Sequence, residues 1–554
     1  MREKYISIII FTLLFTPNIF FLFVSDFHVS KKIFLLILPI PILTLIFSIL
    51  GTKLFTYFNL LLTPLLFIEL FSLFNYHSFA SFEFINSFFL TNKEEAFEIF
   101  YTYSIYIILL LILISFNLFL CFKARIYKTK KMNFNLFFIS IALVVLSYLF
   151  TFINTKSTEN KIKYGVKTSL ITQTNEIFLS RLNNTSPFSF LYNTSNILKE
   201  KRNFRNYFNI IKDFKFNAHK EKSINQETYV LVIGESSRKH NFSAYGYQKK
   251  TTPNLDTISN ILLFKNTIST SNNTAIAIPH ILTRATPNQN QIKLEEPTLI
   301  QAFKEAGFKT YWLSNQYTNN ETIYKLYSNQ ADVIYNREDL TADKTYFDGN
   351  IAPVFNKIIK EKNAAAKKLI IIHLSGSHFN YKNKYPKEFN HFKPTLTDNA
   401  SINLSVKEEL INTYDNSIRY TDFVLSKLIF SLKEQKNVSS FLYYISDHGE
   451  NLFDDSNNYI FHSYPIPKKH ELEVPFFIWT SKKYVENYPQ KNKTLQLNIN
   501  KKISSTISFH SIIDMAGIRY ENQELSKSIS SNIFNSNQDR HIYTTEGKII
   551  KYHD

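Results

Sequence analysis

Three apolar runs of the chain each end in side chains that can bind a metal ion or move a proton. The groups that follow them are Gly-Glu-Ser-Ser at 234–237, Ser-Gly-Ser-His at 375–378 and Ser-Asp-His-Gly-Glu at 446–450. Glu235, Asp447 and His448 would together offer two oxygen ligands and one nitrogen ligand, a set that suits zinc or manganese better than copper. On spacing alone, a metal site and ordinary turn or hydrogen-bonding roles stay equally open.

Asp447 and His448 are adjacent, and neighbouring side chains of an extended strand point to opposite faces. They can reach one ion only if the chain turns where the strand ends. We expect Gly449 to permit that turn, because glycine adopts backbone conformations that other residues avoid.

Hydroxyl groups for such a site precede an apolar turn: Thr270, Ser271 and Thr274 come before Pro279 and His280. A threonine hydroxyl is a poor nucleophile at neutral pH, but coordination to a metal would lower its pKa. At a helix N-terminus it would also face amide N–H groups that favour phosphate. By composition alone, an ordinary Ser/Thr helix cap is the simpler interpretation.

Strands alternating with helices after residue 226 would position these groups. Short apolar runs rich in β-forming residues predict strands at 229–233, 310–313, 369–373, 441–445 and 476–480. Helical spacing recurs between them, over 298–306 ahead of Gly307 and from Leu410 to Leu432. This alternation predicts an α/β domain with a mostly parallel sheet and helices on both faces, and its ligand site should lie at the carboxyl ends of the strands.

The first 153 residues are predominantly apolar. Five stretches are near the roughly 20 residues that a bilayer requires, namely 5–24, 33–50, 54–74, 105–122 and 134–153. The first lacks a cleavage site after its basic start, so we interpret it as a retained helix. Arg2, Lys4 and the basic loop 123–131 favour the cytoplasm, whereas the net acidic loop 75–100 favours the outside, although Lys31 and Lys32 weakly oppose this orientation. Five spans then place everything after residue 153 outside the cytoplasm.

The chain therefore divides into a transmembrane domain (1–153), a linker or interfacial-helix region (154–225) and a catalytic α/β domain (226–554). In the middle region, a basic aromatic helix on the membrane surface and a plain linker are equally consistent with residues 188–208. Glu69 lies inside the third predicted span, where a charge is costly. Snorkelling to the outer surface and a substrate role are both open for it.

Composition excludes other classes of protein. The 554 residues carry a net charge of +18, but the basic residues are scattered and lie mostly in the part predicted outside the cytoplasm, which excludes nucleic acid as a partner. Such a charge would instead favour an anionic membrane and a phosphate-rich glycolipid. The single cysteine, Cys121, excludes a disulfide framework and a Cys-rich zinc module.

Together these segments resemble the membrane-bound phosphoethanolamine transferases of Gram-negative bacteria, which lie in the alkaline phosphatase/sulfatase superfamily. The five-span head is similar too. The stretches that carry the resemblance, in family order, are Val232–Ser236, Tyr245–Tyr247 with Thr252–Asp256, Thr274–Pro279, Thr310–Gln316, His373–His378 with Tyr385-Pro386, Tyr414–Asp422, Ser446–Glu450 and Val474–Phe477.

The resemblance implies that Thr274 is the nucleophile and becomes modified with phosphoethanolamine. It implies one zinc ion bound by Glu235, Thr274, Asp447 and His448, and it leaves a second ion during turnover open. His378 and His462 match a second histidine pair that holds the substrate phosphate or that second zinc.

In the external loop, Thr91 and Glu95 match a family pattern that contacts the headgroup of the lipid donor. Ser87 stands where the family usually has Asn. A solvated acidic interfacial helix is an equally good interpretation of these residues. Thr270 and His280 stand where many lipid A-modifying members have cysteines, so the chain looks most like the disulfide-free branch that acts on lipopolysaccharide core sugars and other periplasmic acceptors.

The expected function is therefore a monomeric inner-membrane enzyme that moves phosphoethanolamine from phosphatidylethanolamine, through Thr274, to lipopolysaccharide or lipooligosaccharide (core or lipid A) or another periplasmic acceptor. A phosphoglycerol transferase, or another member of the superfamily that transfers or hydrolyses phosphoesters, is the alternative. A sulfatase would need Cys or Ser in the pattern C/S-x-P-x-R, which the stretch from Thr274 to Pro279 lacks. A membrane-anchored scaffold with a degenerate site is disfavoured, because all four zinc positions hold competent ligands.

Overall fold

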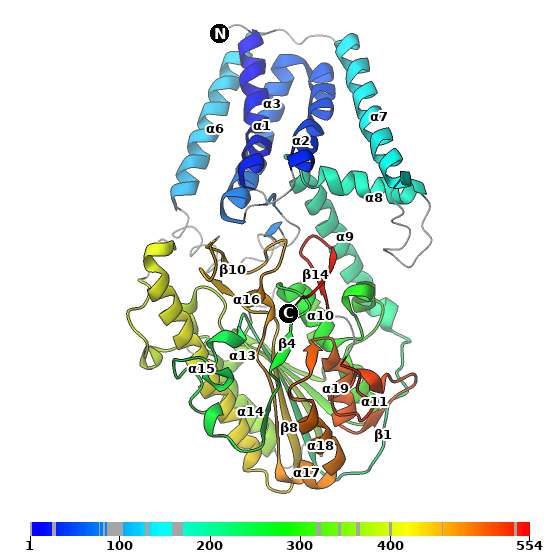
Figure 1. The fold of residues 1–554 in the computed structure, drawn as a ribbon, viewed down its shortest axis with the longest axis vertical. Coiled ribbons are helices and arrows are strands. Elements are labelled where there is room, and N and C mark those ends of the chain that lie inside the picture. Colours follow the sequence, from blue (N-terminus) through cyan, green and yellow to red (C-terminus); the bar gives the residue numbers. More distant parts are fainter. Residues whose placement is uncertain are drawn as a thin grey trace. The chain divides into compact units, whose positions relative to one another are not determined.

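The computed structural model describes residues 3–24, 29–76, 78–80, 84–85, 104–127, 132–157, 170–316, 323–341, 345–361, 366–397, 402–456, 458–536 and 540–553. They form two compact units, Met1–Lys199 and Glu200–Asp554 (Figure 1). The boundary falls within the region 154–225, which the sequence assigned to a linker or interfacial helices.

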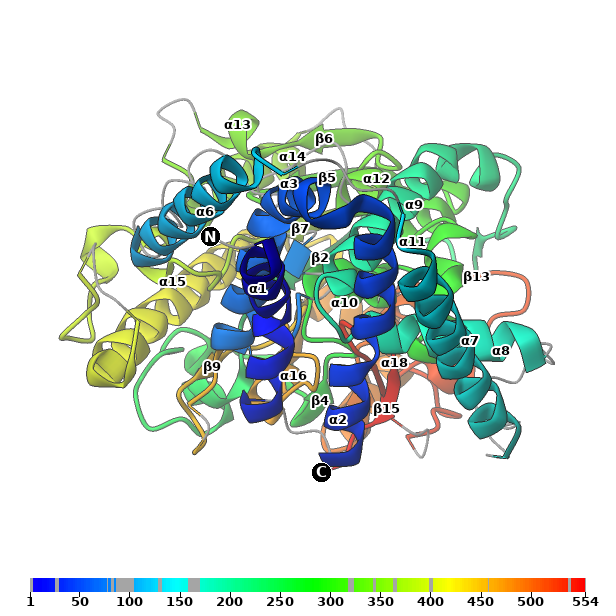
Figure 2. The same cartoon turned by 90° about the horizontal axis from the view of Figure 1, so that it is seen from above.

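The first unit is helical. Its helices are α1 (Glu3–Val24), α2 (Val29–Ile37), α3 (Pro39–Tyr76), α6 (Ser104–Ala124), α7 (Phe134–Ser157), α8 (Leu170–Leu182) and the first half of α9 (Phe188–Ile211). Apolar side chains of α1, α3 and α6 share one buried cluster, in which Ile10 packs with Phe55 and Leu120, and α3 also packs against α7 (Figure 2). Many apolar side chains of α6 and α7 are exposed, as lipid-facing residues are in a membrane protein.

Within the described residues, four helical stretches are long and apolar enough to cross a membrane: Tyr5–Val24, Lys32–Asn75, Ser104–Ala124 and Phe134–Asn154. The second stretch has 44 residues, about twice what one span needs. Its helix α3 is interrupted at Gly51, where φ is 64° and ψ is 174°, between the predicted spans 33–50 and 54–74. A membrane-length apolar region is thus present at every predicted span, and the count of five spans stays a prediction.

Glu69 of α3 does not snorkel to a surface. Its side chain is fully buried, and its two carboxylate oxygens accept the backbone N–H groups of Ala80 at 2.8 Å and Phe190 at 2.9 Å. The carbonyl of Ala80 in turn accepts the Ser189 hydroxyl at 3.0 Å and the Asn193 amide at 2.9 Å. Glu69 therefore satisfies one amide in the first turn of α9 and one in the segment 78–80, and it ties α3 to that helix as a capping carboxylate does.

The second unit is built on a seven-stranded sheet. Its strand order is β3 (Ile261–Leu263), β11 (Phe476–Thr480), β8 (Ser439–Ser446), β2 (Glu227–Gly234), β7 (Lys367–His373), β5 (Lys309–Ser314) and β6 (Val333–Tyr335). A strand is present at each of the five predicted runs. The five strands from β8 to β6 are parallel to one another, whereas β11 is antiparallel to both of its neighbours. The carboxyl end of β11 therefore lies at the edge opposite to the predicted site, which the sequence pattern alone does not reveal.

Alternate residues of β2 enter the two hydrophobic layers of the domain. Leu231 packs with α10 (Thr274–Leu282), α11 (Leu299–Glu305) and α19 (Ile507–Met515), whereas Val230 and Val232 pack with α14 (Ile351–Lys360) and α15 (Lys407–Lys433). All of these β2 side chains are fully buried. Such a continuous apolar strand is expected where helices cover both faces of a parallel sheet, and Figure 1 shows the helices on either side of it.

Smaller elements complete the domain. They are the strand pairs β1 (His219–Lys220) with β13 (Ile518–Arg519), β4 (Asn266–Ile268) with β12 (Lys502–Ser504), β9 (Asn451–Leu452) with β10 (Ile460–Phe461) and β14 (His541–Tyr543) with β15 (Ile549–Lys551), and the helices α12 (Ile323–Ser328), α13 (Arg337–Leu340), α16 (Lys469–Leu472), α17 (Lys482–Asn487) and α18 (Pro489–Asn498).

Candidate metal and nucleophile site

The central strands β2 and β8 bring the predicted carboxylates together. They are parallel, and Gly234 is in register with Ser446, so the residues that follow, Glu235 and Asp447, leave the sheet side by side. Ligand atoms of Glu235, Asp447 and His448 lie within 4.8 Å of one another, and all three residues are buried. The predicted convergence at the carboxyl ends of the strands is therefore present.

The hydroxyl of Thr274 completes this group. Its Oγ1 atom lies 2.7 Å from Asp447 Oδ2, 3.2 Å from His448 Nε2 and 3.3 Å from Glu235 Oε2. Thr274 is the first residue of α10, but the helix is capped by Asn273, whose side chain accepts the N–H of Ala275 at 2.9 Å. The Thr274 hydroxyl is therefore not a helix cap, and it is directed at the two carboxylates and the imidazole.

Hydrogen bonds fix the orientation of Asp447 and His448. Asp447 Oδ1 accepts the backbone N–H of Ser236 at 3.1 Å and of His448 at 2.7 Å, which leaves Oδ2 for Thr274. His448 Nδ1 lies 2.8 Å from the carbonyl of Gly449. Because a carbonyl oxygen can only accept, Nδ1 carries the proton, and the lone pair of Nε2 faces the Thr274 hydroxyl. Metal-binding histidines are commonly oriented in this way.

Glu235 is held by two side chains that lie within the sequence motifs but were given no role there. The hydroxyl of Ser236 donates to Glu235 Oε1 at 2.8 Å, and the amide of Gln316 donates to Oε2 at 2.9 Å. Gln316 comes just after β5, so the rule that directed attention to the ends of three strands would have found it at a fourth.

The charges of the cluster fit a divalent cation. Burial raises the pKa of the Glu235 carboxyl well above its usual value, and the nearby charge of Asp447 raises it further. Burial lowers the pKa of His448, which keeps its imidazole neutral and able to act as a ligand. Two buried carboxylates beside a neutral imidazole and a hydroxyl form a donor set of the kind that zinc binds, and a cation would offset the repulsion between the carboxylates.

Gly449 is needed for a reason other than the predicted one. Its φ is not positive, but a Cβ atom added there would lie 2.1 Å from the carbonyl oxygen of His470 and 2.9 Å from Cβ of Arg238. The segments are hydrogen-bonded, because Gly449 N–H donates to Glu471 O at 2.7 Å and Glu450 N–H donates to His470 O at 3.0 Å. Glycine here permits close approach of two backbones directly after the candidate ligands.

His378 and His462 lie beside the cluster, although His462 is reached only through a loop. The ring centroids of His378 and His462 are 6.0 Å apart, and those of His448 and His462 are 4.1 Å apart. Burial lowers the pKa of His378 to about 3 and that of His462 to about 4, so both imidazoles are neutral. His462 Nδ1 lies 3.2 Å from Glu450 Oε1, and its neighbours Phe461 and Ser463 both have left-handed backbones, a strained arrangement that is frequent at functional sites.

The loop ahead of Thr274 is joined to α10 by a hydrogen bond between Thr270 and His280. Thr270 Oγ1 lies 2.8 Å from His280 Nδ1, and His280 Nε2 lies 3.1 Å from the side-chain oxygen Oδ1 of Asn290. Nε2 therefore donates to Asn290, and Nδ1 accepts the Thr270 hydroxyl proton. Burial lowers the pKa of His280 to about 3. The two positions thus form a neutral, buried contact that brackets the nucleophile segment.

Two predicted residues, Thr91 and Glu95, together with Ser87, lie outside the described residues.

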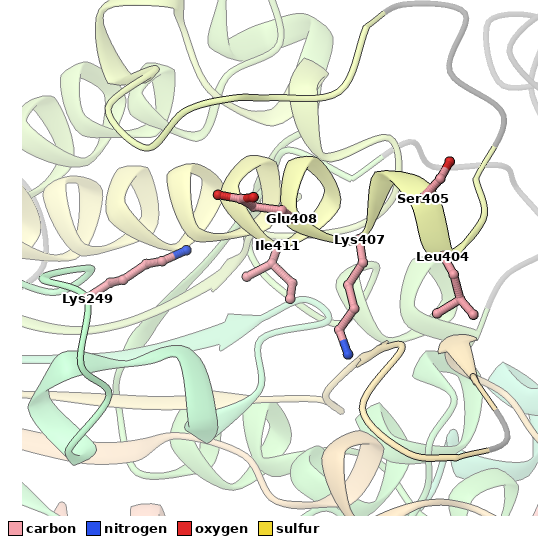
Figure 3. A pocket seen from close by; sticks show the side chains of 6 residues that line it. All are labelled: Lys249, Leu404, Ser405, Lys407, Glu408 and Ile411. Atoms are coloured by element: carbon pink, nitrogen blue, oxygen red, sulfur yellow. The ribbon is translucent and has the colours of Figure 1, made fainter.

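A separate open cleft of about 410 Å³ lies at the start of α15 (Figure 3) and contains none of the predicted site residues; it is lined by Lys249, Leu404, Ser405, Lys407, Glu408 and Ile411. Its two lysines are already paired, Lys249 with Asp415 at 3.0 Å and Lys407 with the carbonyl of Phe453 at 2.5 Å.

Comparison with known proteins gives consistent results. Curated relatives include phosphoethanolamine transferase EptC of Escherichia coli (strain K12), 33% identical over 320 residues that cover 56% of this chain and 54% of the relative. Another is phosphoethanolamine transferase EptA of Helicobacter pylori (strain ATCC 700392 / 26695), 34% identical over 291 residues that cover 51% of this chain and 52% of the relative. The matched region thus spans about half the length of these relatives.

Solved structures resemble the chain as well. The C-terminal periplasmic domain of EcEptC from Escherichia coli, in complex with Zn, has a TM-score of 0.54 and 30% identity and covers 60% of this chain and 95% of its own. The integral membrane protein lipooligosaccharide phosphoethanolamine transferase A from Neisseria meningitidis has a TM-score of 0.65 over 94% of this chain and 98% of its own. Its identity is 18%, so it supports the fold alone: several apolar N-terminal helices followed by an α/β domain.

Residues 227–518, just over half of the chain, match the protein family described as Sulfatase. This range contains every described member of the candidate site, from Glu235 to His462. The resemblance drawn from the motifs is confirmed, because the homologues of this chain include proteins named phosphoethanolamine transferases. The chain belongs to the sulfatase family.

Proposed function

We propose that the chain is a phosphoethanolamine transferase that takes its group from phosphatidylethanolamine, carries it on Thr274 and passes it to lipopolysaccharide, lipooligosaccharide or another periplasmic acceptor. One observation carries this proposal. The Thr274 hydroxyl, at the start of α10, lies within 3.3 Å of Asp447, His448 and Glu235. A hydroxyl surrounded by proton acceptors, at the N-terminus of a helix, where phosphate is favoured, is arranged for attack on phosphorus.

In the first transfer, Thr274 Oγ forms a bond to the donor phosphorus and the bond from phosphorus to the diacylglycerol oxygen breaks. Asp447 Oδ2, at 2.7 Å from Thr274 Oγ1, is placed to accept the hydroxyl proton, which finally resides on the departing diacylglycerol. In the second transfer an acceptor oxygen forms a bond to phosphorus and the bond from phosphorus to Thr274 Oγ1 breaks, while the proton lost by the acceptor hydroxyl is returned to Thr274. His378 and His462 lie beside the cluster, and a phosphate bound there would favour their protonated forms, which can donate hydrogen bonds to its oxygens in either step.

Zinc would be held by Glu235, Thr274, Asp447 and His448, whose donor set suits it. When bound, it lowers the pKa of a coordinated hydroxyl and offsets negative charge at the transferring phosphoryl group. One ion accounts for these four residues; His378 and His462 are proposed to hold substrate phosphate, or a second ion during turnover.

The remaining assignments follow the same proposal. The apolar head (1–153) would anchor the enzyme in the inner membrane through five spans, with the linker region (154–225) and the catalytic domain (226–554) in the periplasm. Thr91 and Glu95 would contact the donor headgroup. The absence of cysteines from the catalytic domain supports the branch that acts on lipopolysaccharide core sugars, and we propose a monomer that binds membrane lipids and no nucleic acid.

Substitution of the nucleophile tests the proposal. Full-length protein in detergent is incubated with labelled phosphatidylethanolamine or phosphatidylglycerol, and Thr274 is analysed by mass spectrometry. We expect phosphoethanolamine on Thr274, diacylglycerol from phosphatidylethanolamine only, and loss of both in Thr274→Ala. Thr257→Ala, which removes an exposed threonine hydroxyl, is the matched control and should remain active. Full transfer by Thr274→Ala would overturn the mechanism, and diacylglycerol from phosphatidylglycerol would favour the alternative headgroup.

A further inference from the structure

Asp348 is a buried carboxylate behind the candidate site. It begins a short 3-10 helix, Asp348–Asn350, just before α14, and its side chain is 2% exposed. Oδ1 accepts the side-chain amide of Asn315 at 2.8 Å and the backbone N–H of Ser375 at 2.9 Å. Oδ2 accepts the backbone N–H of Gly376 at 2.8 Å. Both oxygens are therefore used by groups that follow β5 and β7.

The Ser375–Gly376 segment packs directly against the backbone of Glu235. Gly376 has a φ of +51°, and a Cβ atom there would lie 2.6 Å from the carbonyl oxygen and 2.9 Å from the nitrogen of Glu235. The next residue, Ser377, donates its N–H to the same carbonyl oxygen at 2.9 Å. The segment then continues into His378. Its backbone thus contacts one candidate ligand and carries a second candidate site residue.

The other partner of Asp348 also leads to Glu235. Asn315 is tied to β7 because its N–H donates to the carbonyl of His373 at 3.0 Å. Its neighbour Gln316 donates to Glu235 Oε2 at 2.9 Å and to the carbonyl of Leu374 at 2.8 Å. Asp348 therefore holds both Ser375–Gly376, which packs against the Glu235 backbone, and Asn315–Gln316, which orients the Glu235 carboxylate.

Successive backbone N–H groups that point the same way form a concave site for an anion, and buried N–H groups without an acceptor are strongly disfavoured. Ser375 and Gly376 make such a site, and an internal carboxylate fills it. We propose that Asp348 is a positioning residue of the metal site, which sets the place of Glu235 through Ser375–Gly376 and Asn315–Gln316. The inference rests on the proposed function for the identity of the metal.

The test replaces the carboxylate with its nearly isosteric amide, Asp348→Asn, in the full-length protein. The amide nitrogen would face an N–H group, so at least one of the three bonds is lost. Zinc affinity is measured by competition with a fluorescent chelator, alongside urea unfolding of the metal-free protein and kcat and KM with labelled phosphatidylethanolamine. We expect a loss of zinc affinity of about 10- to 100-fold, as other changes behind metal ligands produce, and a fall in kcat with little change in KM.

Asp422 supplies a matched control, because it is a fully buried carboxylate of α15 that also accepts three N–H groups. They come from the backbones of Asn254 (3.0 Å) and Leu255 (2.9 Å) and the Asn254 side chain (2.7 Å). Asp422→Asn should lower stability and leave zinc affinity within twofold. If Asp348→Asn does not fold, Asn315→Ala removes one of the three bonds and should weaken zinc binding by a smaller factor.

The inference would be overturned if Asp348→Asn bound zinc with wild-type affinity, or if Asn315→Ala did so when it is the variant tested. It would also be overturned if Asp422→Asn lost as much zinc affinity as Asp348→Asn. A wild-type chain that binds zinc but transfers no phosphoethanolamine would remove the proposed function and leave the inference standing, because metal affinity reports the position of Glu235 directly.

Discussion

Replacing Gly449 with alanine should disable the site while adding only one methyl group. The new Cβ would lie 2.1 Å from His470 O, whereas contacts below 3.0 Å are essentially never seen. One backbone must therefore move by about 1 Å, and a displacement of that size near reacting groups can lower the rate by about 10²-fold. Overpacking of this kind typically costs about 1–3 kcal/mol of the unfolding free energy. The neighbouring hydrogen bonds from Gly449 and Glu450 would weaken as well, each contributing about 1 kcal/mol.

The assay compares kcat with labelled donor lipid, zinc affinity and urea unfolding in Gly449→Ala and Gly246→Ala. Gly246 has a φ of +102° but nothing within 4 Å of an added Cβ, so alanine there introduces backbone strain without a clash. We expect Gly246→Ala to lose stability and keep kcat, and Gly449→Ala to lose both. If Gly449→Ala kept kcat and zinc affinity within twofold of wild type, the close approach of the His470 backbone would not be what positions the ligands, and the reasoning would be wrong.

Three further outcomes are expected. His280→Ala should remove the shorter of the two hydrogen bonds of the buried Thr270 hydroxyl and leave only the contact with Ser505 Oγ at 3.2 Å, which costs about 1 kcal/mol. It should also reduce kcat more than KM; unchanged kcat would contradict a role in holding the nucleophile segment. Removal of metal with a chelator should abolish Thr274 modification, and zinc should restore it better than magnesium, because imidazole and carboxylate ligands suit zinc; full modification in the chelator would contradict the metal assignment. Burial acts to raise the pKa of Asp514, but Lys491 and Arg519 outweigh it and hold that pKa below its usual value. The stability gained is complete above the unfolded pKa of about 3.9 and is lost as the pH falls through the folded pKa. Asp514→Asn should therefore destabilise most at pH 7 and progressively less as the pH is lowered below the unfolded pKa, and an equal loss at every pH would refute the ion-pair explanation.

The core of the site could be predicted because parallel strands end at one edge of a sheet. Glu235 and Asp447 follow directly after β2 and β8, so any parallel pairing of these strands places them close together. The direction of β11 could not be predicted in the same way, because a buried apolar run has the same composition in either direction. Its antiparallel pairing explains why no site residue follows Thr480.

Other parts of the site depend on contacts between distant segments. His462 reaches the cluster through left-handed residues on both sides of it, which are not glycines and so carry no signal in the sequence. Asp348 acts through the backbone of Ser375 and Gly376, and its importance depends on a turn whose geometry only the folded chain shows. The sequence predicts that Gly449 permits a turn, whereas the structure shows that glycine there makes room for the backbone of His470. That backbone is 21 positions away in the sequence, so the contact could not be predicted.

The position of β2 and β8 within the sheet has a consequence for amide hydrogen exchange. Each strand has a hydrogen-bonded neighbour on both sides, and central strands of this kind commonly exchange only through global unfolding. Glu235, Asp447 and His448 follow these strands directly, so separating the ligands requires opening the slowest-exchanging part of the domain. A bound metal should therefore slow amide exchange throughout the seven-stranded sheet, because the free energy of metal binding adds to the free energy of global unfolding. The protection should not be limited to the loops around the metal.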